Sequence, residues 1–146
     1  MKQFMVLIAV LPLMLMLLLQ FTLDQMNESK IALVNDYVYT AKEEAKQKGG
    51  FTSDIQIALR QKLASALGIS ENEIVISTNA DMQGSIKRMT SASAISSADW
   101  KNKLIYYKVS VPIGKMMAGT EFLGIRESDN KYIYTVDAYT ASEWLD

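Results

Sequence analysis

The fold is decided by the stretch FMVLIAVLPLMLMLLLQFTL, residues 4–23, in which only Gln20 and Thr22 are polar. A helix of this length spans about 30 Å, which matches the hydrocarbon core of a bilayer. A secretory signal peptide has a shorter apolar region, followed by small residues at its cleavage site. No such site follows Leu23. The stretch is therefore not an ordinary cleaved signal peptide, and two interpretations stay open: a membrane anchor and an assembly helix.

The charges on either side of this stretch predict its orientation in a membrane. Lys2 and the amino terminus carry the positive charges before it, and Asp24 and Glu28 follow it. Because positive charge favours the cytoplasmic side, we expect a single-pass membrane protein with a cytoplasmic N-terminus. Residues 1–24 would form a transmembrane or assembly helix. Residues 25–146 would form an extracytoplasmic head that includes the continuation of this helix.

The apolar pattern continues beyond the membrane half. After Asp24 it narrows to a stripe of apolar residues three or four positions apart, as on one face of an amphipathic helix. No proline or glycine interrupts the pattern until Gly49, where a helix would end. We therefore predict one helix from about residue 3 to about residue 48, about 69 Å long, with at most a mild bend at Pro12. The stripe should pack against the rest of the chain, and it consists of Ile31, Val34, Val38, Ala41 and Ala45.

A second helix is predicted over residues 53–67. Apolar residues recur at every fourth position, and Gly68 follows as a C-terminal stop. Ser53 and Gln56 have the spacing of a capping box, which would place Ser53 at the N-cap. The face expected in the core consists of Ile55, Leu59, Leu63 and Leu67.

Strands follow the two helices. Alternating or β-branched residues predict strands over residues 73–78, 103–111 and 131–139. The second strand is expected to end at Pro112, and Glu127–Asn130 should form the turn before the third. Two helices followed by successive strands predict an α+β fold with a small antiparallel sheet.

Three other segments are less distinct. Residues 84–89 are a weaker strand candidate, and residues 90–99, rich in serine and alanine, are predicted to be a flexible surface loop. Residues 114–124 receive no assignment. Their glycines oppose a stable helix, whereas their apolar residues indicate packing.

The composition excludes the commonest catalytic chemistries. The chain has no cysteine and no histidine, which removes thiolate chemistry, the usual general base near neutral pH and the commonest zinc ligand. Its net charge is −1, so no overall field attracts nucleic acid. No nucleotide-binding loop, zinc spacing or nucleophile motif is present. We therefore expect no enzyme activity, no cofactor, no bound metal and no nucleic-acid partner.

Tyrosines in the predicted strands admit two interpretations. Aromatic residues in strands usually pack across the sheet against one another. A stacking platform for a ligand such as a carbohydrate is the other interpretation. The residues concerned are Tyr106, Tyr107, Tyr132, Tyr134 and Tyr139.

The segment LIAVLPLMLMLLL, residues 7–19, resembles the opening of TadE-like pseudopilins of tight-adherence (Tad) pilus systems. Residues 109–113, a strand closed by proline, are also similar to that family, and a long helix carrying a small α+β head is the type IV pilin plan. The resemblance implies a structural subunit of a surface pilus or of its assembly or secretion machinery, at the cell surface when assembled. Implied partners are the membrane, other pilin-like subunits, the assembly platform and further copies of the chain, bound through the N-terminal helix. The helix residues expected in the membrane and in assembly are Phe4, Leu7, Leu11, Pro12, Leu15, Leu18 and Gln20.

Two departures from the family pattern bear on assembly. The family usually carries a glutamate six residues before the proline, where it meets a neighbour's N-terminal amine, and this chain has Val6 there. Only residues 1–3 precede Phe4, so we expect either that a leader is already missing or that the chain is not processed. Val6 favours a minor subunit over one that polymerises alone. The alternative function is a single-pass membrane-anchored extracytoplasmic binding or sensor domain.

Overall fold

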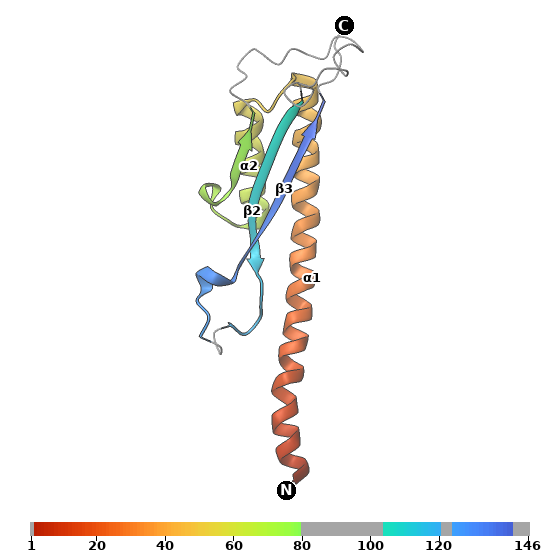
Figure 1. Ribbon diagram of the computed structural model, residues 1–146, viewed down its shortest axis with the longest axis vertical. Coiled ribbons are helices and arrows are strands. Elements are labelled where there is room, and N and C mark those ends of the chain that lie inside the picture. The colour runs from red at the N-terminus through yellow and green to blue at the C-terminus, as the bar shows by residue number, and fades with distance from the viewer. Residues whose placement is uncertain (1, 80–103, 121–123, 142–146) are drawn as a thin grey trace.

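The structure, a computed structural model, describes residues 2–79, 104–120 and 124–141. A long helix runs the full length of the molecule, and a small head of one helix and one sheet lies against its C-terminal half (Figure 1). The α+β fold is therefore the one predicted. In chain order the elements are α1 (Lys2–Lys48), α2 (Ser53–Leu67), η1 (Glu71–Glu73), β1 (Val75–Thr78), β2 (Ile105–Lys115), η5 (Glu127–Asn130) and β3 (Lys131–Thr140).

Helix α1 is continuous over 47 residues and passes through Pro12 without ending. The prediction of one long helix is confirmed, because residues 22–30, between the apolar half and the stripe, stay helical. The helix stops at Gly49, whose φ of 82° lies in the left-handed region that glycine adopts at little cost. The Gly50 amide then donates a hydrogen bond to the Ala45 carbonyl (2.8 Å), which satisfies one acceptor of the last turn.

Helix α2 has the predicted bounds but not the predicted N-terminal cap. Its N-cap is Thr52, and Ser53 is already helical, so the capping box proposed for Ser53 and Gln56 is wrong. The Gln56 side chain instead donates to the Phe51 carbonyl (3.0 Å), one residue before the cap. At the other end Gly68 has a φ of 67°, and its amide donates to the Ala64 carbonyl, as expected for a glycine C-cap.

The sheet is antiparallel with the order β1-β2-β3, so the central strand is β2. Strand β2 does not end at Pro112 as predicted but continues to Lys115. Pairing between β1 and β2 ends at Val75 and Ser110, so no strand among the described residues pairs with β2 beside Pro112 on that side. A proline is tolerated there, because the amide hydrogen it lacks is not needed for a ladder. The register with β3 shifts between Pro112 and Gly114.

The remaining predictions for the second half of the chain have mixed outcomes. The turn at Glu127–Asn130 is a short 3-10 helix, η5. Residues 84–89 and 90–99 lie outside the described residues. The unassigned segment after Gly114 is the end of β2 followed by a connection that returns to η5 and β3. We call its described residues, 116–120 and 124–126, the β2–β3 loop.

The core lies between the amphipathic half of α1, one face of α2 and the inner face of β2 (Figure 1). The predicted stripe on α1 does pack against the head: Val34, Val38, Ala41 and Ala45 are buried, and Ile31 is partly buried. On α2, Ile55, Leu59 and Leu63 are buried and Leu67 is partly buried. Strand β2 contributes Ile105, Tyr107, Val109, Val111 and Ile113. The head is therefore fixed to α1 by shared core rather than by a tether.

Candidate functional site

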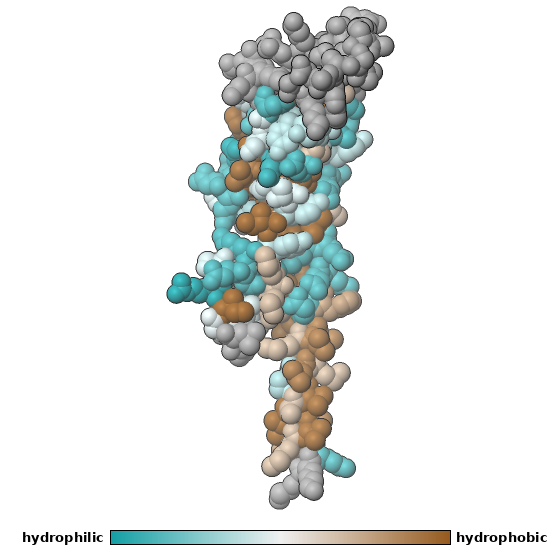
Figure 2. Space-filling model, viewed as in Figure 1, coloured by the Kyte–Doolittle hydropathy of each residue, from teal (hydrophilic) through white to brown (hydrophobic). Residues whose placement is uncertain are grey.

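The N-terminal half of α1 is the largest exposed apolar surface among the described residues. Its large apolar side chains from Phe4 to Leu19 are exposed, from 45% at Val10 to 72% at Met5, with Met16 partly exposed. Figure 2 shows brown side chains covering the helix below the head. Of the residues predicted for the membrane or for assembly, Phe4, Leu7, Leu11, Pro12, Leu15 and Leu18 lie on this exposed surface, whereas Gln20 is partly buried. Soluble monomers rarely expose so large a contiguous apolar surface, which makes this surface a candidate for contact with lipid or with other helices.

This half of α1 also meets the polar requirements of a membrane span. It is the one helix among the described residues that is long and apolar enough to cross a bilayer. Its backbone groups pair within the helix, as a span requires, except at the first turn and at the Ile8 carbonyl, which Pro12 leaves without a helical donor. The Thr22 hydroxyl donates to the Leu18 carbonyl (3.0 Å), so this polar atom also has a partner inside the helix. A single membrane span is therefore compatible with both composition and hydrogen bonding.

Gln20 joins the apolar half of α1 to the β2–β3 loop. Its Nε2 donates to the Asp24 carboxylate (2.9 Å) and to the Met116 carbonyl (3.1 Å), and its Oε1 accepts from the Ala118 amide (2.9 Å). The sequence placed Gln20 among the residues expected in the membrane and in assembly. In the structure its side-chain amide is hydrogen-bonded within its own chain, to Asp24 on the same helix and to two loop residues almost one hundred positions away.

Two further side chains of α1 bind the same end of β2. Asn27 Nδ2 donates to the Lys115 carbonyl (2.9 Å), and Lys30 Nζ donates to the Ile113 carbonyl (2.7 Å). Sequence reasoning missed these contacts. A signal was present, because positions 20, 24 and 27 continue the three-or-four spacing that leads into Ile31 and Val34. Polar residues on the line of an apolar stripe indicate polar contacts made by that same face.

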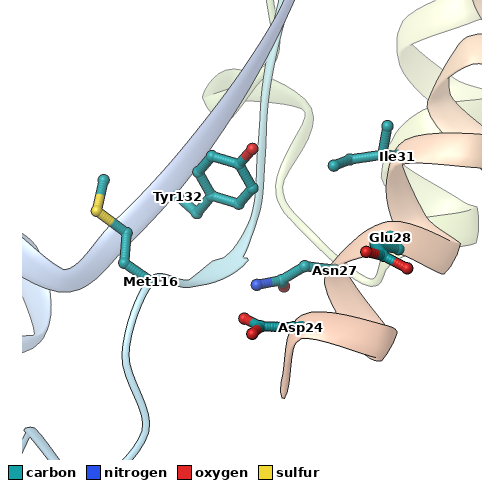
Figure 3. A pocket seen from close by; sticks show the side chains of 6 residues that line it. All are labelled: Asp24, Asn27, Glu28, Ile31, Met116 and Tyr132. Carbon is teal, nitrogen blue, oxygen red and sulfur yellow. The ribbon is translucent and has the colours of Figure 1, made fainter. Parts of the chain in front are cut away.

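A cleft of about 480 Å³ opens between α1 and the start of the β2–β3 loop. Figure 3 shows Asp24, Asn27, Glu28 and Ile31 on the helix side and Met116 and Tyr132 on the opposite side, with the Tyr132 ring pointing toward the helix. Two carboxylates, an amide and an aromatic ring could together bind a small cationic or amphipathic group. Among the described residues, no group of three or more acidic, histidine or cysteine side chains is placed to hold a metal ion.

The tyrosines do not form one platform. Tyr106 and Tyr139 pack together on the outer face of the sheet, with ring centroids 5.1 Å apart. Tyr107 is buried on the other face against Phe51, also at 5.1 Å, and Tyr134 donates from its hydroxyl to Asn35 of α1 (3.0 Å). The structure therefore favours cross-strand and core packing over a stacking site.

The ionisable groups with shifted pKa values have structural causes. Hydrogen bonds from Lys46 and Lys42 lower the pKa of Glu43 on α1, and the ion pair with Lys115 lowers that of Glu127. Burial raises the pKa of Tyr107 and, with the nearby Asp137, that of Tyr106. None of these groups lies in the cleft or on the apolar half of α1. Among the groups with shifted pKa values, none therefore supplies an activated acid or base at the candidate site.

Comparisons of the chain with protein-family models, with curated proteins and with solved structures find no match. The resemblance to TadE-like pseudopilins therefore stays a prediction from the N-terminal residues.

Proposed function

We propose that this chain is a pilin-like structural subunit, similar to TadE-like pseudopilins, of a surface pilus or of its assembly or secretion machinery. One observation supports the proposal best: an unbroken 47-residue helix has its second half built into the core of the head and its first half exposed. Before assembly the first half would span the membrane, with the N-terminus cytoplasmic and the head extracytoplasmic. Assembly would bring the head to the cell surface.

The rigid connection between the two halves of α1 argues for this function over a simple anchor. Val34 and Val38 are fully or almost fully buried, so the head cannot leave the helix without exposing its own core. An anchor needs only a tether between membrane and domain. A filament subunit needs a fixed head, because the packing of its helix against neighbours then sets the position of every head.

The exposed leucine and methionine surface supplies the free energy of assembly. Once withdrawn from lipid, such surface contributes about 25 cal/mol for each Å² that neighbouring helices bury. At position 6 a glutamate would add a buried ion pair that fixes the stagger between neighbours at a cost in desolvation. Val6 provides no such pair. We therefore propose a minor subunit, whose register depends on companion subunits.

Photo-cross-linking inside the apolar half tests the structural role. A photoreactive amino acid is placed at Leu11 in cells that carry a tight-adherence pilus system, and Ile57, an exposed apolar residue on α2, is the matched control position. We expect adducts between Leu11 and pilin-like subunits or further copies of the chain, and none from Ile57. Adducts with lipid alone would contradict the proposal and favour an anchored domain.

Expression without companions tests the minor role. We expect no long filaments in negative-stain micrographs, because hydrophobic contacts alone specify the register loosely. Long, regular filaments of this single chain, unchanged by Val6→Glu, would contradict both the minor role and the reasoning from register.

The cleft supports a second candidate function, a single-pass membrane-anchored extracytoplasmic binding or sensor domain. Asp24 and Glu28 of α1 and Tyr132 of β3 line a space large enough for a small ligand (Figure 3). This function does not require a rigid connection between the exposed half of α1 and the head, and it does not require companion subunits. It predicts that the phenotype of Glu28→Gln with Asp24→Asn matches a deletion of the whole protein, while Leu11 cross-links only to lipid.

A further inference from the structure

We propose that the β2–β3 loop is a second membrane contact, which seats the head at the boundary between the acyl chains and the headgroups of the outer leaflet. This inference rests on the proposed insertion of α1 into a bilayer. The partner is the lipid surface itself, and the contacting side chains are Met116, Met117 and Ile125.

The height of the loop along α1 places it at the bilayer surface. Gln20 bonds the loop through the Met116 carbonyl and the Ala118 amide. Gln20 lies three residues before Leu23, the end of the apolar run, and three helical residues span about 4.5 Å. Figure 1 shows the loop descending beside α1, below the sheet. When the apolar run fills the hydrocarbon core, the bonded part of the loop lies just inside its outer edge.

The side chains of the loop suit that position. Met116 is 51% exposed and Met117 is 47% exposed, and the exposed Ile125 belongs to the same loop. Methionine is unbranched and polarizable, so it adapts to an irregular environment such as the boundary of acyl chains and headgroups. These three side chains extend the apolar surface of α1 sideways at its outer end.

The backbone of the loop is already hydrogen-bonded, which is the condition for entering a poorly hydrated zone. The buried Asn130 side chain accepts from the amides of Met116 (3.1 Å) and Met117 (2.9 Å), and donates to the Met117 carbonyl (2.9 Å) and to Thr120 Oγ1 (3.0 Å). Gln20 satisfies the Met116 carbonyl and the Ala118 amide. Five backbone groups of residues 116–118 thus have partners inside the protein, while the methionine side chains stay free for lipid.

Lipid suits this small surface better than a second copy of the chain does. Specific protein interfaces bury about 1,200–2,000 Å² in total, far more than three side chains provide. A membrane contact made by an anchored protein needs no such area, because α1 already holds the loop at the surface and keeps its effective concentration high. The nearby ion pair between Lys115 and Glu127 (2.9 Å) is neutral overall, so the contact should not require anionic lipid.

The chain has no cysteine, so single-cysteine labelling gives no background. The full chain is reconstituted in vesicles of phosphatidylethanolamine and phosphatidylglycerol with an environment-sensitive fluorophore at one position. The positions are Met117→Cys in the loop, Leu13→Cys in the apolar half of α1, and Ile133→Cys on the outer face of β3, where the side chain is also apolar and exposed. Spin-labelled lipids with shallow or deep labels measure contact with the bilayer, and iodide measures contact with water.

We expect the shallow label to quench the probe at Met117 several-fold more than the probe at Ile133, and iodide to do the reverse. The deep label should quench only the probe at Leu13. Gln20→Ala, which frees the loop from α1, should reduce lipid quenching at Met117 and leave quenching at Leu13 unchanged. Ile125→Cys should repeat the result for Met117.

The outcomes separate this inference from the proposed function. Lipid quenching at Leu13 with iodide-accessible probes at Met117 and Ile125 would overturn the loop contact and leave membrane insertion standing. No lipid quenching at Leu13 would overturn both. Protection of Met117 that disappears when the protein is diluted in excess lipid would identify a second copy as the partner, and would equally overturn the lipid contact.

Discussion

Gly114 and Asn27 meet where β2 crosses α1, and a pair of substitutions there tests how tightly the two are joined. A Cβ atom at Gly114 would lie 2.5 Å from Asn27 Oδ1. Asn27 is only 5% exposed, and its Nδ2 is bonded to the Lys115 carbonyl, so the amide cannot swing aside without losing that bond. Gly114 has no positive φ, so its backbone would accept alanine. The steric clash with Asn27 is therefore the one reason to expect that Gly114→Ala destabilises the fold.

The sizes of these interactions predict the change in the free energy of unfolding for each variant. Overpacking costs about 1–3 kcal/mol, and losing the Asn27 hydrogen bond adds about 1 kcal/mol, so Gly114→Ala should lower the free energy of unfolding by about 2–4 kcal/mol. Asn27→Ala alone should cost about 1 kcal/mol, because water can reach the exposed Lys115. With Asn27→Ala present the new methyl has room, and alanine is favoured over glycine in a strand by about 0.5–1 kcal/mol. Gly114→Ala should then be neutral or stabilising.

The assay is urea unfolding of the full chain in detergent micelles, followed by near-ultraviolet circular dichroism of the tyrosines, since Tyr107 packs against Phe51 in the core. A double-mutant cycle of the two substitutions should give a coupling free energy of about 2 kcal/mol or more. Equal effects of Gly114→Ala in both backgrounds would refute the close crossing of β2 and α1.

Three further predictions concern the core, the alkaline limit and the membrane. Leu63→Ala should lower the free energy of unfolding by about 2–5 kcal/mol, while Ile57→Ala on the exposed face of the same helix should change it by less than about 0.5 kcal/mol in the same assay. Burial raises the pKa of Tyr107, so the folded state holds the phenolic proton more tightly and stability should fall as the pH rises above about 10. Tyr107→Phe should weaken that fall in urea titrations at alkaline pH, and an unchanged fall would place its cause elsewhere. Finally, washing membranes with alkaline carbonate should leave the protein in the membrane pellet. External protease should digest the head but not residues 4–23. A shortened chain in the soluble fraction would instead show that the apolar run is cleaved off.

Local pattern was sufficient for the positions of both helices and of the three described strands, but not for the start of β1 or the end of β2. Residues 3–48 carry an apolar run and then a stripe with a period near 3.6, and no glycine or proline after Pro12 breaks it. The face of α2 followed from its period of four in the same way. The capping box failed because Ser53 and Thr52 are both competent N-caps by residue type, and only the path of the chain after Gly50 decides which one is extended.

The contacts of the candidate site could not be read from the sequence, because each joins distant segments. The β2–β3 loop has no period of its own, and its conformation is imposed by Asn130 from one side and Gln20 from the other. Pro112 was expected to end β2, since a proline usually lacks a place in a central strand. That expectation depended on the length of β1, which sequence alone did not give.

The hydrogen bonds between Gln20 and the β2–β3 loop determine how long a part of α1 would be surrounded by lipid in the proposed membrane insertion. The hydrogen bonds to the β2–β3 loop extend to Gln20, four residues before the predicted boundary at residue 24, and among the described residues none of them involves residues 3–19. That length of helix measures about 26 Å, slightly less than the hydrocarbon core of an average bilayer. A rigid helix can meet such a mismatch by thinning the bilayer or by bringing adjacent apolar surface into it. Gln20 fixes the methionines of the loop beside the outer end of this part of the helix. Their apolar side chains would therefore enter the bilayer without any rearrangement of the protein.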